Sequence, residues 1–264
     1  MMMTALGILV LYTQEWRGLV YNNLGAIELM KGIPDISRLE PELVGDRLLY
    51  LRRAENYFQE AYIQWNYAAS RKNLAKIYRL RGDTFSAIEN WDQAITNYQK
   101  ALEIDTTSVV LYKKLGEIYT YRKPHEPQYL DQAIHYLETA VTSSPRSSYI
   151  RLVLGHALFF RKRMPEAIDQ LEISVALEPN GYNWTVLGRI YLAERRWTSA
   201  INCFQKALAL EPKRIDTWLA LGEAYAGEND IDQALLAWQA VINLAPDSNL
   251  AQEARLKIAG LTGD

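Results

Sequence analysis

Residues 183–246 read NWTVLGRIYLAERRWTSAINCFQKALALEPKRIDTWLALGEAYAGENDIDQALLAWQAVINLAP. One order of residue types occurs twice in this stretch. Its small and helix-breaking members return 34 positions later, in the pairs Gly188 and Gly222, Ala200 and Ala234, Pro212 and Pro246. A fixed period of this size marks an array of repeated structural units. The period therefore decides the fold class of the chain.

The first half of each unit predicts an amphipathic helix. Trp184, Leu187 and Tyr191 are spaced i, i+3 and i+7, so they form one stripe. Gly188 lies beside this stripe, and its missing Cβ lets a second helix approach closely. This contact outweighs the helix-propensity cost of glycine, which is about 1 kcal/mol.

The second half of each unit predicts a partner helix. Ala200, Phe204 and Ala207 form the facing stripe, and Pro212 ends the helix. One hairpin cannot bury both its faces alone, so neighbouring hairpins stack into a solenoid. The order W-x-x-L-G-x-x-Y, then A-x-x-x-F, then P resembles the tetratricopeptide repeat (TPR) family. The resemblance implies an all-α fold, an α-α superhelix of about six helical hairpins with a C-terminal capping helix.

The pattern extends in weaker form over most of the chain. We predict an apolar lead over residues 1–14 and a single TPR solenoid domain over residues 15–264. The hairpins are expected near 16–65, 68–106, 109–145, 148–179, 181–214 and 215–247, with a cap over 250–261. The first hairpin is expected to contain a long loop over residues 32–46, because this segment holds Pro34, Pro41 and Gly45.

The second hairpin matches the pattern in its own way. Leu74, Ala75 and Tyr78 fit the Leu, Gly and Tyr positions of a first helix. This register predicts a turn at residues 82–84. Two registers that differ by about two helical turns both fit the second helix, so we predict one extended helix over residues 85–103.

Composition narrows the classes of function. The 264 residues are 49% hydrophobic, which is enough for a sizeable core. The 29 Lys and Arg against 31 Asp and Glu give a net charge of −2, which argues against nucleic acid as the main partner. The single Cys203 excludes an internal disulfide framework, and we expect a buried, inert thiol.

The sequence holds no motif that indicates catalysis. Phosphate-binding glycine loops, dinucleotide fingerprints, zinc-protease helices and nucleophile elbows are all missing. The three histidines, His125, His135 and His156, are scattered, and no Cys, His, Asp or Glu cluster has metal-ligand spacing. We therefore predict no catalytic residue, no metal and no cofactor.

The N-terminal lead is continuously apolar from Ala5 to Tyr12. This run is too short to span a bilayer, which needs about 20 residues. No Lys or Arg precedes it, so the basic region of a secretory signal is missing. Two interpretations stay open, a helix start packed on the first repeat and a segment that contacts a membrane. The expected location is cytoplasmic or peripheral to a membrane.

A second resemblance concerns residues 17–29, RGLVYNNLGAIEL. After the apolar lead, this stretch resembles the junction between the last membrane helix and the TPRs of bacterial O-antigen ligase or polysaccharide polymerase-like proteins. The chain lacks the many membrane helices of such enzymes. The resemblance therefore implies a detached TPR region that serves a cell-envelope polysaccharide assembly system.

The TPR resemblance also implies a binding groove. In such arrays the second, fifth, ninth and twelfth residues of each repeat line a concave face. These positions supply our candidate peptide-binding residues Lys72, Lys76, Arg79, Lys113, Tyr149, Leu152, His156, Tyr182 and Arg189. The stretch 71–81 is rich in Lys and Arg and holds no acidic residue, so the groove would be basic near repeats two and three and aromatic near repeats four and five.

The alternative to a groove is an ordinary solvated face. Its charges would then be paired with Glu55, Glu60 or Glu117, and Leu152 and Phe159 would belong to the core. We expect a non-catalytic scaffold that binds a protein or peptide partner, acidic or mixed acidic and apolar. An accessory component of polysaccharide assembly near a membrane is the alternative function, and an unrecognised enzyme is the third.

Overall fold

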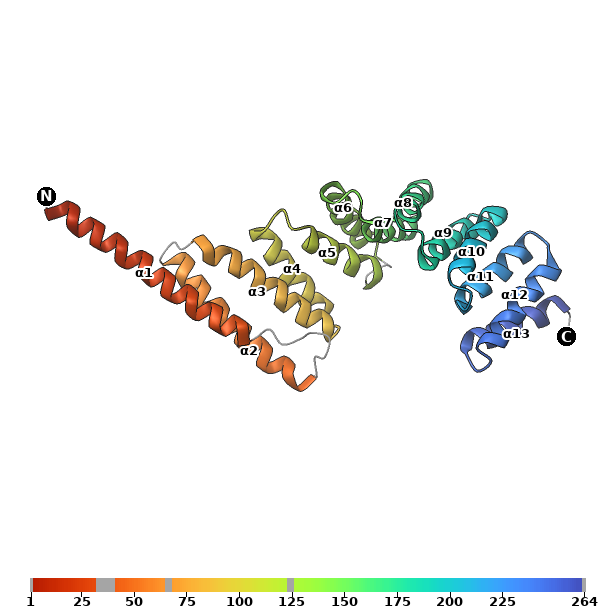
Figure 1. Cartoon of the computed structure of the whole chain (residues 1–264), viewed down its shortest axis with the longest axis horizontal. Helices are drawn as coiled ribbons and strands as arrows, with labels where there is room; N and C mark the ends of the chain where they lie inside the picture. The colour runs from red at the N-terminus through yellow and green to blue at the C-terminus, as the bar shows by residue number, and fades with distance from the viewer. Residues whose placement is uncertain (1, 32–40, 65–67, 123–125, 263–264) are drawn as a thin grey trace. The chain divides into compact units, whose positions relative to one another are not determined.

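The computed structural model describes residues 2–31, 41–64, 68–122 and 126–262. In the first of these ranges the side chains are described from residue 17 on, and in the second from residue 44 on. Over these residues the chain forms thirteen helices and no strand (Figure 1). The structure is 85% helical, so the all-α prediction is confirmed. None of the described helices combines the length and the apolar content that a membrane crossing requires.

The helices follow one another in chain order. They are α1 (Met2–Lys31), α2 (Pro41–Ile63), α3 (Ala68–Ala87), α4 (Trp91–Ile104), α5 (Val109–Arg122), α6 (Pro127–Ser143), α7 (Ser148–Phe160), α8 (Met164–Leu177), α9 (Gly181–Ala193), α10 (Trp197–Leu210), α11 (Ile215–Gly227), α12 (Ile231–Leu244) and α13 (Asn249–Thr262). Each short connection between two helices turns the chain back, so consecutive helices pack as hairpins.

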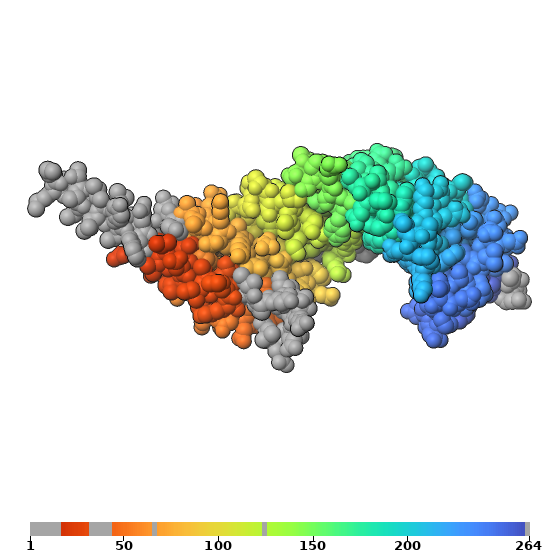
Figure 2. Space-filling model, in the orientation of Figure 1, coloured from red at the N-terminus to blue at the C-terminus, as the bar shows by residue number. Residues whose placement is uncertain are grey.

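The chain divides into two compact units, residues 1–122 and 123–264. In unit 1 each of the helices α1 to α5 packs against the next, around a core that includes Leu51, Phe58 and Ile77. In unit 2 the helices α6 to α13 pack in the same consecutive way. The space-filling view shows the neighbouring repeats of each unit in contact (Figure 2). The expectation of one continuous domain stays a prediction.

Small residues allow the close helix contacts, as the sequence predicts. A Cβ placed on Gly188 of α9 would lie 2.5 Å from the Phe204 ring of α10. Gly155 stands in the same relation to Leu171, and Gly222 to Trp238. Each large side chain follows its glycine at the same interval in the sequence and takes the space that a Cβ would need. This one contact recurs in three successive repeats of unit 2.

The second repeat shows that our register was wrong. Gly82 lies inside α3, and a Cβ there would be 2.5 Å from Tyr98 of α4, which follows it at the same interval. The predicted turn at residues 82–84 is therefore helical, and the predicted helix over residues 85–103 is broken before Trp91. Glu89 forms this break with φ 58°, and the Asn90 side chain caps α4. Gly82 also precedes Gly116 by the period that separates Gly188 from Gly222.

The loop expected over residues 32–46 does not extend to residue 46. Helix α2 already begins at Pro41, where proline suits a first turn because no N–H is needed there. Gly45 lies within this helix, and a Cβ there would meet nothing within 4 Å. Residues 32–40 lie outside the described residues, as does His125. Helix α1 runs without interruption from the apolar lead into the first repeat.

Candidate functional site

In unit 1 the corrected register changes the basic part of the candidate surface. Counted from Gly82, the lining positions of repeat two are Lys76, Arg79, Asp83 and Ser86. Lys72 precedes them by one turn of α3. The predicted stripe of positive charge therefore continues into a carboxylate.

Asp83 is the centre of a polar cluster in unit 1. Its carboxylate accepts a hydrogen bond of 2.7 Å from the Tyr98 hydroxyl and lies 3.0 Å from Nζ of Lys114. The Arg79 guanidinium is 3.9 Å away. Burial and the Asp83 charge raise the pKa of Tyr98, so this hydroxyl stays protonated and donates. The cluster joins α3 to α4 and α5.

Other basic residues of this region also have acidic neighbours. Nη1 of Arg81 lies 2.5 Å from the Glu55 carboxylate, and Nζ of Lys113 lies 3.9 Å from Glu117. For Arg81 and Lys113 the structure therefore agrees with the alternative in which the basic residues are paired with acidic neighbours. Lys72 and Lys76 are exposed and make no ion pair within the described part of the chain. They remain the accessible cations of this surface.

In unit 2 the candidate residues lie on α7 and α9. Tyr149 is 47% exposed and Tyr182 is 43% exposed, and both occupy the second position of their repeats. Leu152 is only 2% exposed and belongs to the core, so we leave it out of the binding surface. Phe159 is partly buried against the same core. The two tyrosines are therefore the large apolar groups that this surface offers.

His156 and Arg189 form the polar part of this surface. Burial, and then the Arg189 charge, lower the pKa of His156 to about 4, so the imidazole is neutral at pH 7. Nη2 of Arg189 lies 3.3 Å from the Asp216 carboxylate of α11. Asp216 also pairs with Arg214, whose guanidinium stands 5.2 Å over the Tyr182 ring. Positive and negative charges alternate here, in the part of the groove that we expected to be aromatic.

We call these two sets, without the buried Leu152, the first-helix surfaces. The surface of unit 1 comprises Lys72, Lys76 and Arg79 on α3 and Lys113 on α5. The surface of unit 2 comprises Tyr149 and His156 on α7 and Tyr182 and Arg189 on α9. The predicted residues are thus divided between the two units.

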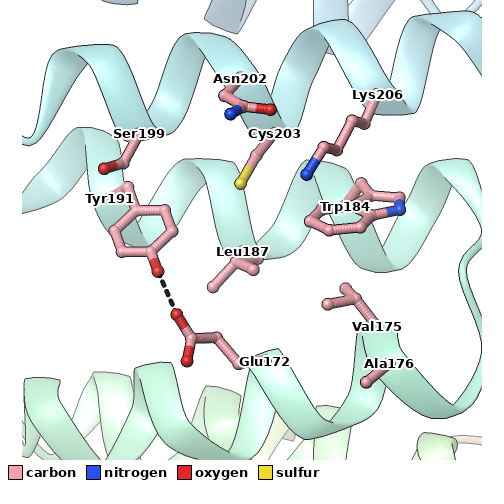
Figure 3. A pocket seen from close by; sticks show the side chains of 10 residues that line it. All are labelled: Glu172, Val175, Ala176, Trp184, Leu187, Tyr191, Ser199, Asn202, Cys203 and Lys206. Carbon is pink, nitrogen blue, oxygen red and sulfur yellow. Dashed lines mark hydrogen bonds between the residues drawn. The ribbon is translucent and has the colours of Figure 1, made fainter.

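A pocket that was not predicted from the sequence lies on the other side of α9. It has a volume of about 380 Å³ and lies between α8, α9 and α10 (Figure 3). Trp184, Leu187 and Tyr191 form one wall, and we had assigned these residues to packing alone. Polar residues of α10 at helical spacing, Ser199, Asn202 and Lys206, were the signal that could have indicated an open face.

Cys203 lines the pocket but is buried, as predicted, and burial raises the pKa of its thiol to about 11. Among the described residues, no three His, Cys, Asp or Glu side chains are placed to hold a metal ion. His135 is exposed on α6.

Comparison with protein families points to one family. Three family models match, described as tetratricopeptide repeat (residues 191–258), TPR repeat (residues 82–120) and tetratricopeptide repeat (residues 130–181). Together they cover more than half of the chain. The resemblance of residues 17–29 to O-antigen ligase-like membrane proteins is not borne out.

Curated relatives match over about two thirds of this chain. TPR repeat-containing protein MJ1428 of Methanocaldococcus jannaschii is 24% identical over 65% of this chain and 31% of its own length. Superkiller protein 3 of Schizosaccharomyces pombe is 24% identical over 63% of this chain and 12% of its own length. Human protein O-mannosyl-transferase TMTC1 is 24% identical over 66% of this chain and 19% of its own length. The chain therefore spans less than a third of the length of these relatives.

Solved structures share the fold. MamA has a TM-score of 0.59 and 26% identity, over 66% of this chain and 92% of that one. YrrB, described as a TPR protein with an unusual peptide-binding site, has a TM-score of 0.58 and 22% identity, over 75% and 97%. Pseudomonas aeruginosa pilF has a TM-score of 0.60 and 18% identity, over 93% and 99%.

Proposed function

Because the chain belongs to the tetratricopeptide repeat family, we propose that it is a non-catalytic scaffold that binds a protein or peptide segment on its first-helix surfaces. One observation carries this proposal. Tyr149 and Tyr182 are about half exposed at the same position of consecutive repeats. Aromatic side chains dominate the energetics of protein interfaces, because they bury a large area and retain a polar group.

The charges indicate which partner suits each surface. In unit 1, Lys72 and Lys76 are exposed cations and attract carboxylates. In unit 2, the positive charge of Arg189 is offset by Asp216, and His156 is neutral at pH 7. This surface therefore selects for apolar and aromatic contact. Acidic residues of a partner therefore suit the surface of unit 1, and apolar or aromatic residues suit the surface of unit 2.

The test of the charged part is a titration with the partner segment that crosslinking to the purified chain identifies. The double variant Lys72→Glu, Lys76→Glu should lose at least about tenfold in affinity at low salt and less at high salt, because salt screens exposed charges. The matched control is Arg52→Glu, Arg53→Glu, which makes the same charge change on α2 of the same unit. If the two double variants bind equally well, the basic residues of α3 are only a solvated face.

The test of the aromatic part uses the same segment. The double variant Tyr149→Ala, Tyr182→Ala should weaken binding by about tenfold or more at both salt concentrations, since apolar contact is not screened. Tyr62→Ala on α2 removes an exposed tyrosine elsewhere and serves as the control. Unchanged binding by the double variant would place the partner on another surface and reject the proposal for unit 2.

We further propose that α1 contacts a membrane surface. In its described part, α1 exposes the large apolar residues Leu19, Val20, Leu24, Ile27 and Met30. The apolar lead precedes these residues on the same helix. A helix that leaves apolar side chains exposed in this way can insert them at the boundary between lipid headgroups and acyl chains.

A further inference from the structure

Unit 2 contains two pockets that are built in the same way, one repeat apart. The first, of about 380 Å³, has Trp184, Leu187 and Tyr191 on its α9 wall (Figure 3). The second, of about 490 Å³, lies between α10, α11 and α12. Its corresponding wall holds the residues one repeat period later, Trp218, Leu221 and Tyr225. The two pockets are thus separated by the same period as the sequence repeats.

The tyrosine of each wall is held in place in the same manner. The Tyr191 hydroxyl donates a 2.5 Å hydrogen bond to the Glu172 carboxylate of α8. The Tyr225 hydroxyl accepts a 2.9 Å hydrogen bond from the Gln205 amide of α10. These bonds fix both rings across the side of the pocket. The pockets are therefore preformed, which lowers the entropic cost of binding.

The pockets do not belong to the first-helix surface. Tyr191 follows Tyr182 along α9 by roughly two and a half turns of helix. The two side chains therefore leave α9 on opposite faces. Trp184 and Leu187 lie on the Tyr191 side, while Arg189 lies on the Tyr182 side. A ligand in the pockets leaves the first-helix surface free.

Lys206 adds charge to the first pocket. Its Nζ stands 4.4 Å from the centroid of the Trp184 ring, at the mouth of the pocket (Figure 3). Lys206 is exposed, and within the described part of the chain it makes no ion pair. Glu172, the carboxylate of this lining, lies on the other side and is bonded to Tyr191. The ammonium group is therefore available to a carboxylate of a ligand.

The second pocket lacks charge. Ala240 takes the position of Lys206, and Gln205 takes the position of Glu172. Leu236, at the position of Asn202, is 63% exposed at its rim. This pocket therefore suits a neutral apolar group, whereas the first suits an apolar group beside an acidic one.

The preceding repeat is arranged differently at the same place. Arg151 occupies the position of Trp184, and its Nη1 donates a 2.7 Å hydrogen bond to Gln170 of α8. Its Nε donates to the Pro145 carbonyl at 3.0 Å. This side chain spans from α7 to α8 over the region where an aromatic wall would stand. The aromatic pair of pockets belongs to the two following repeats.

We propose that these two pockets together bind one extended segment of a partner protein. The segment carries two large apolar side chains, one for each pocket, and an Asp or Glu next to the first of them. The volumes are within the range of ligand sites and admit an aromatic side chain. The carboxylate pairs with Lys206 over the Trp184 ring. The proposal is independent of the first-helix surfaces.

The test uses fluorescein-labelled, end-blocked peptides of the form Asp-Phe-spacer-Phe, in which a serine spacer is lengthened one residue at a time. We expect affinity to peak at one spacer length, because the pockets are at a fixed separation. Replacing either Phe by Ala, or Asp by Lys, should reduce affinity by about tenfold or more. Peptides that bind no better than these changed forms at every spacer length would overturn the proposal.

Variants of the protein locate the site. Ala176→Trp and Ala209→Trp fill the first and the second pocket from exposed positions on α8 and α10, and each should reduce affinity by about tenfold. Ala193→Trp, exposed at the end of α9, is the matched control. Lys206→Glu should weaken binding of the Asp peptide and restore binding of the Lys peptide. Equal binding by the filled variants and the control, with circular dichroism confirming their fold, would reject the site.

Cys203 supplies a second readout. It is the single cysteine of the chain and lines the first pocket. A bound peptide should slow its modification by a maleimide at alkaline pH, and the peptide without its first Phe should not. The variant Tyr149→Ala, Tyr182→Ala should retain this protection, which separates the pocket proposal from the proposed function. Loss of protection in that variant would contradict the independence of the two surfaces.

Discussion

At the scale of the residue, glycines at helix contacts decide how closely the helices pack. Gly188 faces the fully buried Phe204 ring, and a Cβ would lie 2.5 Å from it. Gly260 lies in α13, and a Cβ there would meet nothing within 4 Å. The same residue type is therefore required at one position and only tolerated at the other.

We predict opposite effects of leucine at these two positions. Gly188→Leu should destabilise the protein by about 3 kcal/mol through overpacking. Gly260→Leu should stabilise it by up to about 1 kcal/mol, since leucine favours the helix. Urea unfolding followed by circular dichroism measures both. Equal midpoints for Gly188→Leu and the parent would show that the contact of α9 with α10 is looser than the structure has it.

The lowered pKa of His156 leads us to predict that the stability of the folded protein depends on pH. This pKa is about 4 in the folded protein and near 6.5 when unfolded, so the unfolded state binds more protons between these values. Stability should therefore be complete above about pH 6.5 and fall as the pH drops toward 4, by up to about 3 kcal/mol. Solvent access to the half-buried ring reduces this amount.

The measurement for His156 is urea unfolding at a series of pH values. His156→Gln should remove the loss of stability that belongs to this ring and flatten the curve between pH 6.5 and 4. His135→Gln, on an exposed helix face, should follow the parent. A parent and a His156→Gln variant with parallel curves would contradict a neutral His156.

At the scale of the element, the length of a helix depends on the contacts that it makes with its neighbouring helices. Most helices of unit 2 have 13 or 14 residues, whereas α3 has 20 and α1 has 30. Helix α3 reaches Ala87 because Gly82 must lie beside Tyr98 of α4. Helix α1 packs on α2 through Gly25, which faces Phe58, and through the buried Leu29. Both contacts lie in the second half of α1.

The N-terminal part of α1 is therefore predicted to be dispensable for folding. Deleting residues 1–13 should leave the unfolding midpoint of the repeats unchanged, because each repeat contacts mainly its neighbours. The same deletion should weaken binding to liposomes, since it removes the apolar run of the lead and leaves the exposed apolar residues in the described part of α1. Flotation of both forms on a density gradient measures this. A deleted form that floats as well as the parent would rule out membrane contact by the lead.

At the scale of the whole molecule, each unit has its own packed core. In unit 2 one cluster of buried residues runs from Leu152 on α7 to Ala237 on α12. A second cluster continues it from Leu219 to Ala254 on α13. Solenoid stability is the sum of repeat terms and nearest-neighbour interfaces. Such a core does not require helices outside its own unit.

We predict that residues 123–264 fold when produced alone. The fragment should give a helical circular dichroism spectrum and a cooperative urea transition. A fragment of residues 164–264 is the control, because it lacks α7 and exposes the face of α8 that holds Leu171. It should be clearly less stable. An unfolded 123–264 fragment would show that unit 2 depends on unit 1.

The sequence by itself determined the family, the all-helical fold and the hairpins of unit 2. The apolar stripes recur with the repeat period from one hairpin to the next. Such stripes depend only on helical geometry within each hairpin. The glycine contacts and the burial of Cys203 followed from the same local pattern. Tyr149 and Tyr182 were predicted in the same way, since each occupies a fixed position in its repeat, and both are exposed there; their part in binding stays a prediction.

Only the tertiary structure decided the rest. The pattern of repeat two fits two registers, and the contact of Gly82 with Tyr98 selects one of them. The ion pair of Arg189 with Asp216 joins residues of two different repeats. The pockets each need side chains from three helices. Periodicity describes one helix at a time, whereas charge pairing and cavities arise from how stacked helices fill the space between them.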